Sequence, residues 1–525
     1  MMRMTRVVLS AIAVCGLAAQ EPPPRPYVAG VVLSTGGDPV RKAKVILRAH
    51  DEAAFSYTSD SDANGRFVMQ DVLPGVYSFS ADRPGFMPDE DGAPGAPAPS
   101  LKVEAGQSVN DLKIKLVPLA VITGRVLDDD GDPVRGAQLE AMAYTYQTGK
   151  KQLNSLEQAS ANDKGEFRLF GLHPGAIFIR ASSFNRGRFS PGMLGTASFT
   201  PTYFPNTTDA AHASPIELAA GAQLSGIDIR LRREKHYSVR GKLPEVLKHE
   251  VSHRMLQIRP RDGSGGGSGL RQDEETFEFV DVLPGSYVII GDIVSNDKRS
   301  VVRQDVDVVN ADVEGVTLNF VAPVSVSGTV RVEGVLSSPR EKMRVSLDSD
   351  FQGQNSAEVK PDGSFATAEV APDVYKITVG SQPGAYVKSI RFGDEDVSGG
   401  RIDLSKRSGP LTLVLATDMG DVEGSVKKAN GDPAVRVRIT LIAGRSDLSR
   451  YGFTDEQGKF HIREVPPGEY RAFAWQDAPF GAPQDPDFRK PFEKQAVAMK
   501  MDPNGHATVD LQVISVKTPV TEPRP

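Results

Sequence analysis

The sequence predicts an all-β protein, a tandem array of about five antiparallel β-sandwiches that follows a signal peptide. The 525 residues include 50 Gly and 38 Pro, which suits short strands joined by turns better than long helices. A strand-like frame recurs five times, and hardly any segment has apolar residues at the helical period of 3.6. The chain is also too long for a single hydrophobic core, so several domains are expected.

The first residues, MMRMTRVVLSAIAVCGLAAQEPPP, have the pattern of a secretory signal. Arg3 and Arg6 supply the basic segment, a short apolar run follows, and small residues precede Gln20. The apolar run is too short to span a membrane. We therefore expect residues 1–19 to be a signal peptide, with a lipid anchor on Cys15 as the alternative.

Each predicted sandwich begins with the frame aliphatic-x-Gly-x-aliphatic. The alternation is typical of a half-buried strand, and the glycine falls on its inward face. A residue without a Cβ at that place predicts close approach of a neighbouring backbone, or a bulge. The five copies are VAGVV, ITGRV, VRGKL, VSGTV and VEGSV, centred on Gly30, Gly124, Gly241, Gly328 and Gly424.

A second frame follows the first one in every copy. It places Phe on one strand, then a Pro-Gly turn, then Tyr at the start of the next strand, so that the two rings can share a core. The copies read NGRFVMQDVLPGVY, KGEFRLFGLHPGAI, TFEFVDVLPGSY, DGSFATAEVAPDVY and QGKFHIREVPPGEY. Two copies depart from the frame: Ile177 replaces Tyr in the second, and Asp373 replaces Gly in the fourth.

Further strands complete each unit. Asp-Pro turns such as GGDPVRKAKVILRA lie between the two frames, and each unit closes with a short strand, a Gly turn and another strand. About seven short strands per unit fit an antiparallel sandwich, and the short linkers predict modest interfaces. The predicted sandwiches cover residues 20–118, 119–233, 234–322, 323–417 and 418–515, and residues 516–525 form a flexible C-terminal tail.

The first frame, the Gly-Asp-Pro turn and the second frame follow one another along the chain. Together they resemble the carboxypeptidase regulatory-like domain. That family has a prealbumin-like (Ig-like) sandwich, and its relatives include the Cna protein B-type repeats of bacterial adhesins. The first, second and fifth units match well, whereas the other two match mainly in the Phe and Pro-Gly-x-Tyr segment. The resemblance implies a non-catalytic binding or scaffold module in a secreted, periplasmic or cell-envelope protein of a bacterium, without a cofactor. Because the fold is shared with starch-binding modules, it also implies carbohydrate binding as an alternative.

The stretch HEVSH points to an enzyme instead. On a helix it would place His249 and His253 on one face as zinc ligands, with Glu250 as general base. A metzincin-like continuation would need Gly and His where the chain has Leu256 and Arg259. The repeat also places HEVSH between two strands, so we favour a polar connection and keep a zinc hydrolase as the less favoured alternative.

The stretch DSDANGRFVMQD partly fits a calcium-binding loop. Asp60, Asp62, Asn64 and Asp71 would be its ligands. Such a loop normally ends on Glu and lies between helices, whereas strands are expected here. A solvated Asn-Gly hairpin is the simpler interpretation.

Aromatic residues in two long extensions are candidate ligand-binding residues. Trp475 and Phe480 belong to the extension of the fifth unit, and Tyr203 to that of the second. Exposed rings could stack on sugars, although they could equally pack down onto the sandwich.

Charge and hydropathy limit the remaining classes of partner. The net charge of −6 argues against nucleic acid, since phosphate binding requires basic surface. After the signal peptide no stretch is apolar for long enough to span a membrane. The expected partners are a polysaccharide or an envelope protein.

Overall fold

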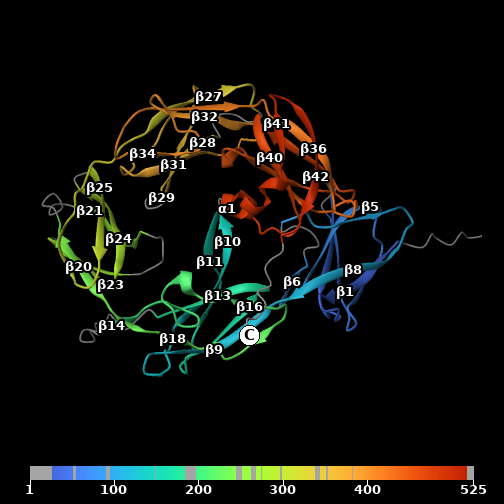
Figure 1. Cartoon of the computed structure of the whole chain (residues 1–525), viewed down its shortest axis with the longest axis horizontal. Coiled ribbons are helices and arrows are strands. Elements are labelled where there is room, and N and C mark those ends of the chain that lie inside the picture. The colour runs from blue at the N-terminus through green and yellow to red at the C-terminus, as the bar shows by residue number, and fades with distance from the viewer. Residues whose placement is uncertain are drawn as a thin grey trace, which may run out of the picture. The chain divides into compact units, whose positions relative to one another are not determined.

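The computed structural model describes residues 26–50, 55–89, 95–147, 149–183, 197–243, 251–261, 268–273, 275–295, 298–336, 343–349, 353–380 and 382–516. The predicted signal peptide, Cys15 and most of the predicted tail lie outside these residues. The described residues form 42 strands and one α-helix of four residues, so the predicted all-β class is confirmed (Figure 1). Contacts divide the chain into two compact units, Met1–Asp89 with Ala98–Pro118, and Glu90–Pro97 with Leu119–Pro525.

The smaller unit holds two four-stranded sheets, ordered β4-β1-β8-β6 and β3-β2-β5-β7. We call its strands the first strand group. A cluster of buried side chains that includes Leu47, Phe67 and Tyr77 belongs to this group. The strands are β1 (Val28–Ser34), β2 (Lys44–Ala49), β3 (Ser56–Asp60), β4 (Arg66–Met69), β5 (Gly75–Asp82), β6 (Phe86–Pro88), β7 (Ser100–Val103) and β8 (Val109–Pro118).

The second strand group opens the larger unit. Its main sheets are ordered β11-β10-β13-β15, with β16 on β13, and β12-β9-β17, with β18 on β9. A separate pair, β14 with β19, lies in the segment that leads to the next group. The strands are β9 (Ala120–Leu127), β10 (Gln138–Gln147), β11 (Lys150–Ser160), β12 (Glu166–Leu172), β13 (Gly175–Ser182), β14 (Ala197–Phe199), β15 (Thr202–Tyr203), β16 (Ile216–Leu218), β17 (Gln223–Leu224), β18 (Ile229–Arg230) and β19 (Arg233–Lys235).

The third strand group has sheets ordered β22-β23-β20-β26 and β21-β24-β25. The side chains of Phe277 and Phe279 lie in its core, with their ring centroids 5.7 Å apart. The strands are β20 (Tyr237–Lys242), β21 (Val251–Pro260), β22 (Gly269–Gln272), β23 (Thr276–Val282), β24 (Gly285–Ser295), β25 (Lys298–Val308) and β26 (Val313–Thr317).

The fourth strand group has sheets ordered β30-β27-β35-β32-β33 and β29-β28-β31-β34. Its core contains Phe365 and Tyr375, one from each part of the second repeat frame. The strands are β27 (Ser327–Glu333), β28 (Arg344–Ser349), β29 (Gly353–Glu358), β30 (Ser364–Ala366), β31 (Val374–Val379), β32 (Tyr386–Phe392), β33 (Glu395–Asp396), β34 (Arg401–Asp403) and β35 (Leu411–Ala416).

The fifth strand group forms one seven-stranded sheet, β38-β37-β40-β42-β36-β39 with β41 on β40. Its extension folds into the 3₁₀ helices η6 (Ala482–Gln484) and η7 (Lys490–Gln495) around α1 (Pro486–Arg489). The strands are β36 (Gly420–Lys427), β37 (Arg438–Ala443), β38 (Arg450–Phe453), β39 (Lys459–Val465), β40 (Gly468–Trp475), β41 (Val497–Met501) and β42 (His506–Ile514). Each group has its own core, but the division into five domains with the predicted boundaries stays a prediction.

The glycine of the first frame performs the predicted role in every group. A Cβ on Gly30 would lie 2.0 Å from the carbonyl oxygen of Leu112, and one on Gly424 would lie 1.8 Å from that of Val509. A Cβ on Gly124, Gly241 or Gly328 would likewise overlap a carbonyl oxygen, that of Ile227, Val316 or Leu411. The predicted close approach of a neighbouring backbone is therefore confirmed.

In four groups that neighbouring backbone belongs to the closing strand, which runs parallel to the first strand, and in the second group it is Ile227, between β17 and β18. β1 pairs in parallel with β8, β20 with β26, β27 with β35 and β36 with β42, while β9 pairs in parallel with β17 and β18. Most other pairs are antiparallel, as predicted. The parallel pair was not anticipated, because the sequence pattern of a strand does not reveal the direction of its partner.

The tyrosine of the second frame fastens the Pro-Gly turn that precedes it. Its hydroxyl donates to the carbonyl oxygen four residues earlier, which ties the strand to the turn. The bond measures 2.7 Å from Tyr77 to Leu73, 2.9 Å from Tyr287 to Leu283, 2.8 Å from Tyr375 to Ala371 and 2.7 Å from Tyr470 to Pro466.

Candidate functional site: arginine contacts between strand groups

Of the predicted zinc residues, His249 and Glu250 lie outside the described residues. His253 lies on β21, where its backbone is opposite Val294 of β24. Residue 253 is therefore part of a strand, and the zinc site itself stays a prediction.

Two of the predicted calcium ligands have backbone roles that other groups share. The Oδ1 atom of Asp62 accepts hydrogen bonds from the backbone N–H groups of Asn64 and Arg66, both at 2.8 Å. The side chains of Asn162 and Asp455 make the same two bonds in the second and fifth groups. Asp62 thus shapes a hairpin, with β3 and β4 on either side of it.

Asp71 lies at a left-handed backbone position, with φ of 57°. Three groups repeat this conformation at the equivalent residue: Gly171 has φ of 75°, Asp281 of 67° and Glu464 of 57°. The strand register shifts at this position in the second, third and fifth groups. The residue therefore marks a bulge. The side chains of Asp60 and Asn64 are exposed, and calcium binding by this loop stays a prediction.

The predicted ligand-binding aromatics differ in exposure. Trp475 is fully buried, its Nε1 donates to Thr440 Oγ1 at 2.9 Å, and its ring stacks on Phe473 at 5.2 Å. A ring in that position has no free face for a sugar, which favours the packing alternative for Trp475. Phe480 is 60% exposed, and Tyr203 is half-buried on β15.

Within the larger unit, arginine side chains bridge successive strand groups or fix the segments that connect them. The first is Arg233, on β19 between the second and third groups. Its guanidinium lies 2.6 Å from Asp128, 3.6 Å from Asp129 and 2.8 Å from Asp130. Hydrogen bonding to Asp130, together with the charge of Asp129, raises the pKa of Arg233.

These three aspartates are the one group of metal-ligating side chains that the described part of the chain brings within 4.8 Å of one another. A cation could bind there by its donor set alone. The guanidinium of Arg233 already supplies the positive charge, so we interpret the three aspartates as part of an ion-pair network around a turn.

The second contact joins the third and fourth groups. The Nη1 atom of Arg303 on β25 lies 2.7 Å from Oδ1 of Asp373. Asp373 is buried, and its carboxylate also accepts from Ser349 Oγ at 2.7 Å and from the backbone N–H of Val374 at 2.8 Å. Nearby, Arg299 forms an ion pair with Asp292 and donates to the carbonyl oxygen of Glu369 at 2.5 Å.

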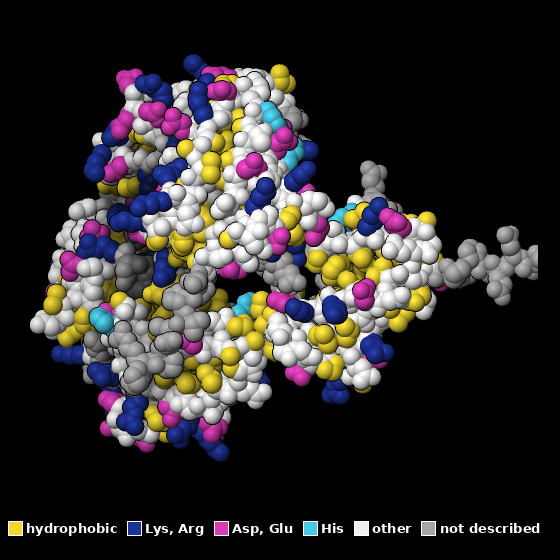
Figure 2. Space-filling view, turned by 45° about the vertical axis from the view of Figure 1, so that its right-hand side comes forward, with side chains coloured by type: hydrophobic (Ala, Val, Ile, Leu, Met, Phe, Trp, Pro, Cys, Tyr) yellow, Lys and Arg dark blue, Asp and Glu magenta, His cyan; other side chains and the backbone are white. Residues whose placement is uncertain are grey.

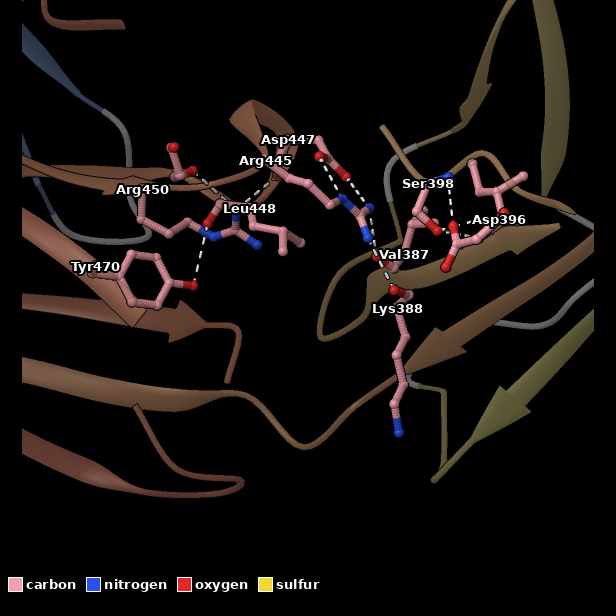
Figure 3. Close-up of polar contacts among 11 residues, drawn as sticks. Val387, Lys388, Asp396, Ser398, Arg445, Asp447, Leu448, Arg450 and Tyr470 are labelled. Carbon is pink, nitrogen blue, oxygen red and sulfur yellow. Dashed lines mark hydrogen bonds and ion pairs between the residues drawn. The ribbon is translucent and has the colours of Figure 1, made fainter. Parts of the chain in front are cut away.

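The third contact joins the fifth group to the fourth (Figure 3). Arg445 precedes the 3₁₀ helix η5 (Ser446–Leu448), and Asp447 holds its guanidinium through bonds of 2.6 and 3.2 Å. The same guanidinium donates to the carbonyl oxygens of Val387 and Lys388, both at 2.9 Å. The register between β32 and β35 shifts between Val387 and Ser389, so Arg445 binds the carbonyl groups of a bulge.

The segment that connects these two groups is tied to both of them. The carboxylate of Asp418 accepts from the hydroxyl of Tyr386 at 3.0 Å, and its carbonyl oxygen accepts from the N–H of Asn504 at 2.8 Å. Burial, followed by the bond to Asp418, raises the pKa of Tyr386. Only Thr417 to Met419 separate β35 from β36, so this connection has little freedom.

The chemistry of these side chains suits them to hold protein groups in place. Guanidinium groups are planar, permanently charged and able to donate several bonds at once, which suits them to join a carboxylate and a carbonyl in fixed geometry. Arg445 bonds to both a carboxylate and backbone carbonyl groups while 22% of its side chain is exposed. These contacts therefore hold neighbouring parts of the structure together. We refer to those of Arg233, Arg303 and Arg445 as the arginine contacts.

Sequence reasoning missed the arginine contacts, although one signal was present. Asp373 stands where the other copies of the second frame have Gly. A residue that departs from a repeated pattern can have a role that the shared fold does not require. For Asp373 that role is the ion pair with Arg303. No comparable signal marks Arg445, because its partners are backbone atoms.

A family model for the carboxypeptidase regulatory-like domain matches residues 27–117 and 421–478. The resemblance is thereby confirmed for the first and fifth strand groups. A search of curated protein sequences found no match. In the described part of the chain no helix has the length and hydropathy of a membrane span.

Solved structures similar to this chain include two bacterial pilins and a third bacterial protein, all of low sequence identity. The shaft pilin SpaA from Lactobacillus rhamnosus GG is 11% identical over 40% of this chain and 97% of that chain, with a TM-score of 0.23. The major pilin subunit BcpA of Bacillus cereus is 10% identical over 94% and 99%, with a TM-score of 0.16. The Bacillus anthracis TIE protein is 12% identical over 56% of this chain and 51% of that chain, with a TM-score of 0.18.

Proposed function

We propose that the protein is a non-catalytic β-sandwich scaffold of the bacterial cell envelope, which holds the strand groups of its larger unit in fixed relation for binding a partner protein. The observation that carries the proposal is the arginine contacts. Arg303 and Arg445 join successive groups, and Arg233 fixes the segment that connects the second and third groups. Flexible linkers would suffice if the groups only needed to be close together, whereas charged contacts between groups restrict their relative orientation.

The family resemblance supports the non-catalytic part of this proposal. The carboxypeptidase regulatory-like domain, matched at both ends of the chain, is a companion module rather than a hydrolase. The predicted signal peptide supports an envelope or secreted location. Since the ring of Trp475 is buried, we base the binding role on a protein partner rather than on a polysaccharide.

Small-angle X-ray scattering on the full mature chain tests the scaffold role. We expect restricted motion among the strand groups of the larger unit in the wild-type protein, and a larger maximum dimension in the combined variant Arg233→Ala, Arg303→Ala, Arg445→Ala. The matched control is Arg344→Ala, because the partner of Arg344, Glu358, lies in the same strand group. A wild-type profile typical of freely tethered domains, or no difference between the combined variant and the control, would overturn the proposal.

A further inference from the structure

The second strand group carries a groove on the solvent side of its sheet β12-β9-β17. The groove has a volume of about 790 Å³ and is lined by β9, β11, β12 and the segment that joins β17 to β18. Glu166, Arg168 and Phe170 of β12 line it with exposed side chains. Phe167 and Leu169 alternate with them along the strand and are buried in the core. A groove of this volume is large enough for a small ligand or for part of a chain.

One exposed aromatic ring lies in the groove. The side chain of Phe170 is 59% exposed, and the guanidinium of Arg168 lies over its ring, 5.2 Å from the centroid. In the other four copies of the second frame the equivalent residue is not aromatic, and it is Gln70, Val280, Ala368 or Arg463. The shared fold therefore does not require a ring at this position, and Phe170 is a feature of the second group alone.

Hydrogen-bonding side chains line the same groove. Gln158 of β11 is exposed, and the exposed carboxylate of Glu166 accepts from Asn162 Nδ2 at 3.0 Å. On the other side of β12, the carboxylate of Asp228 accepts from the backbone N–H and from the Nη2 atom of Arg125, at 2.9 and 3.2 Å. The lining thus offers hydrogen-bond donors and acceptors together.

The charges of the lining cancel, which limits the class of ligand. Two arginines, Arg125 and Arg168, face two carboxylates, Glu166 and Asp228. A polyanion or an acidic peptide would require an excess of basic side chains. Proline-rich peptides are held in grooves lined by several aromatic rings, whereas this groove has one exposed ring. A neutral polyhydroxyl ligand fits better, because its hydroxyl groups both donate and accept and its C–H groups can pack on a ring.

We propose that this groove binds a neutral saccharide, as a segment of a glycan chain. One sugar ring would pack its C–H face on Phe170, while its hydroxyl groups bond to Gln158, Glu166 and the guanidinium of Arg168. Phe170 would thus supply the exposed ring that the buried Trp475 does not. The inference adds a glycan to the partner protein of the proposed scaffold, and it does not depend on the arginine contacts.

Saturation-transfer difference NMR on the full mature chain tests the site with defined probes. The neutral probes are cellohexaose, maltohexaose, xylohexaose and chitohexaose, and the acidic probe is the hexamer of galacturonic acid. We expect at least one neutral probe to receive saturation from the protein and to bind more tightly than the acidic one. Titration of the probe that binds best then gives its dissociation constant.

Variants locate that binding in the groove. Phe170→Gln places at this position the residue type of the first group, so it should keep the fold and weaken binding about 3- to 10-fold through loss of the ring. Phe170→Tyr keeps a ring and should bind as the wild-type protein does. Tyr451→Gln is the matched control, because Tyr451 is an exposed ring on the fifth group, and it should leave binding unchanged. Circular dichroism checks that all three variants are folded.

Three outcomes would overturn the inference: no saturation transfer to any neutral probe, tighter binding of the acidic hexamer than of every neutral one, or equal effects of Phe170→Gln and Tyr451→Gln. A blocked peptide that alternates Val and Ser provides the comparison with a protein ligand. If that peptide binds in a manner that Phe170→Gln weakens and no saccharide binds, the groove belongs to a protein segment instead. Failure of saccharide binding with a rigid scattering profile would reject the groove site alone, and loss of rigidity with intact saccharide binding would reject the scaffold alone.

Discussion

At the scale of single residues, Tyr470 shows how the repeated sequence maintains the fold. Its hydroxyl donates to the carbonyl oxygen of Pro466 at 2.7 Å, and burial raises its pKa to about 12. The ordinary pKa of the phenol is about 10, so the folded protein favours the neutral form. The stability that follows is fully present below about pH 10 and is lost as the pH rises toward 12.

We predict that Tyr470→Phe removes one late-titrating phenol and costs about 1 kcal/mol of unfolding free energy at neutral pH. Absorbance at 295 nm between pH 9 and 13, together with urea unfolding, measures both effects. Tyr451→Phe is the control, because Tyr451 is 57% exposed. Equal losses of stability in the two variants would show that the bond to Pro466 contributes nothing.

Residue patterns predicted the shared positions well and the unit-specific ones poorly. Gly30 and its four counterparts could be interpreted from the sequence because a residue without a Cβ allows close approach of a neighbouring backbone. The structure confirms that approach. The role of Asp71 was not apparent, since an acidic residue before an aliphatic one looks the same whether it binds an ion or adopts positive φ. Burial of Trp475 depends on the extension after β40, whose Phe488 and Phe492 pack against its ring, and the sequence does not show how an extension will fold.

At the scale of elements, the strands themselves were predictable but their partners were not. Alternation identifies a strand from its own residues, whereas the parallel closing pair depends on segments about 80 residues further along, such as Val422 with Ala507. The same holds for β22 of the third group, which pairs with β23, although the third strand of every other group pairs with the second strand. A strand's partner depends on which sheet it packs into best. Neither the residue pattern of the strand nor its position in the repeat predicts that partner.

The contact of β25 with the turn before β31 provides an energetic test at this scale. Removing Arg303 takes away the ion pair of the Asp373 carboxylate, which is buried. A double-mutant cycle with Arg303→Ala and Asp373→Ala should therefore give a coupling energy of about 1–3 kcal/mol in chemical unfolding. The pair Arg344 and Glu358, exposed on both sides, is the control and should couple by less than about 1 kcal/mol. Equal coupling in the two pairs would show that burial of Asp373 does not strengthen the contact.

At the scale of the whole molecule, the segments that connect strand groups in the larger unit make contacts of their own. Connecting segments such as Arg233–Lys235 take part in strands and ion pairs. Positive and negative side chains are interspersed over the face shown in Figure 2, in keeping with 61 basic and 67 acidic residues. Charge is thus distributed over local ion pairs rather than gathered in one extended field, which agrees with the proposed scaffold role.

The most direct test of fixed orientation is the distance between the fourth and fifth strand groups. Cys15 is the only cysteine and belongs to the predicted signal peptide, so spin labels can be placed through Lys360→Cys and Glu456→Cys, both at exposed positions. Pulsed electron paramagnetic resonance should give one narrow distance distribution in the labelled chain, a clearly broader one after Arg445→Ala, and no change after Arg344→Ala. A broad distribution before any arginine is removed, or a distribution that Arg445→Ala leaves narrow, would contradict the account.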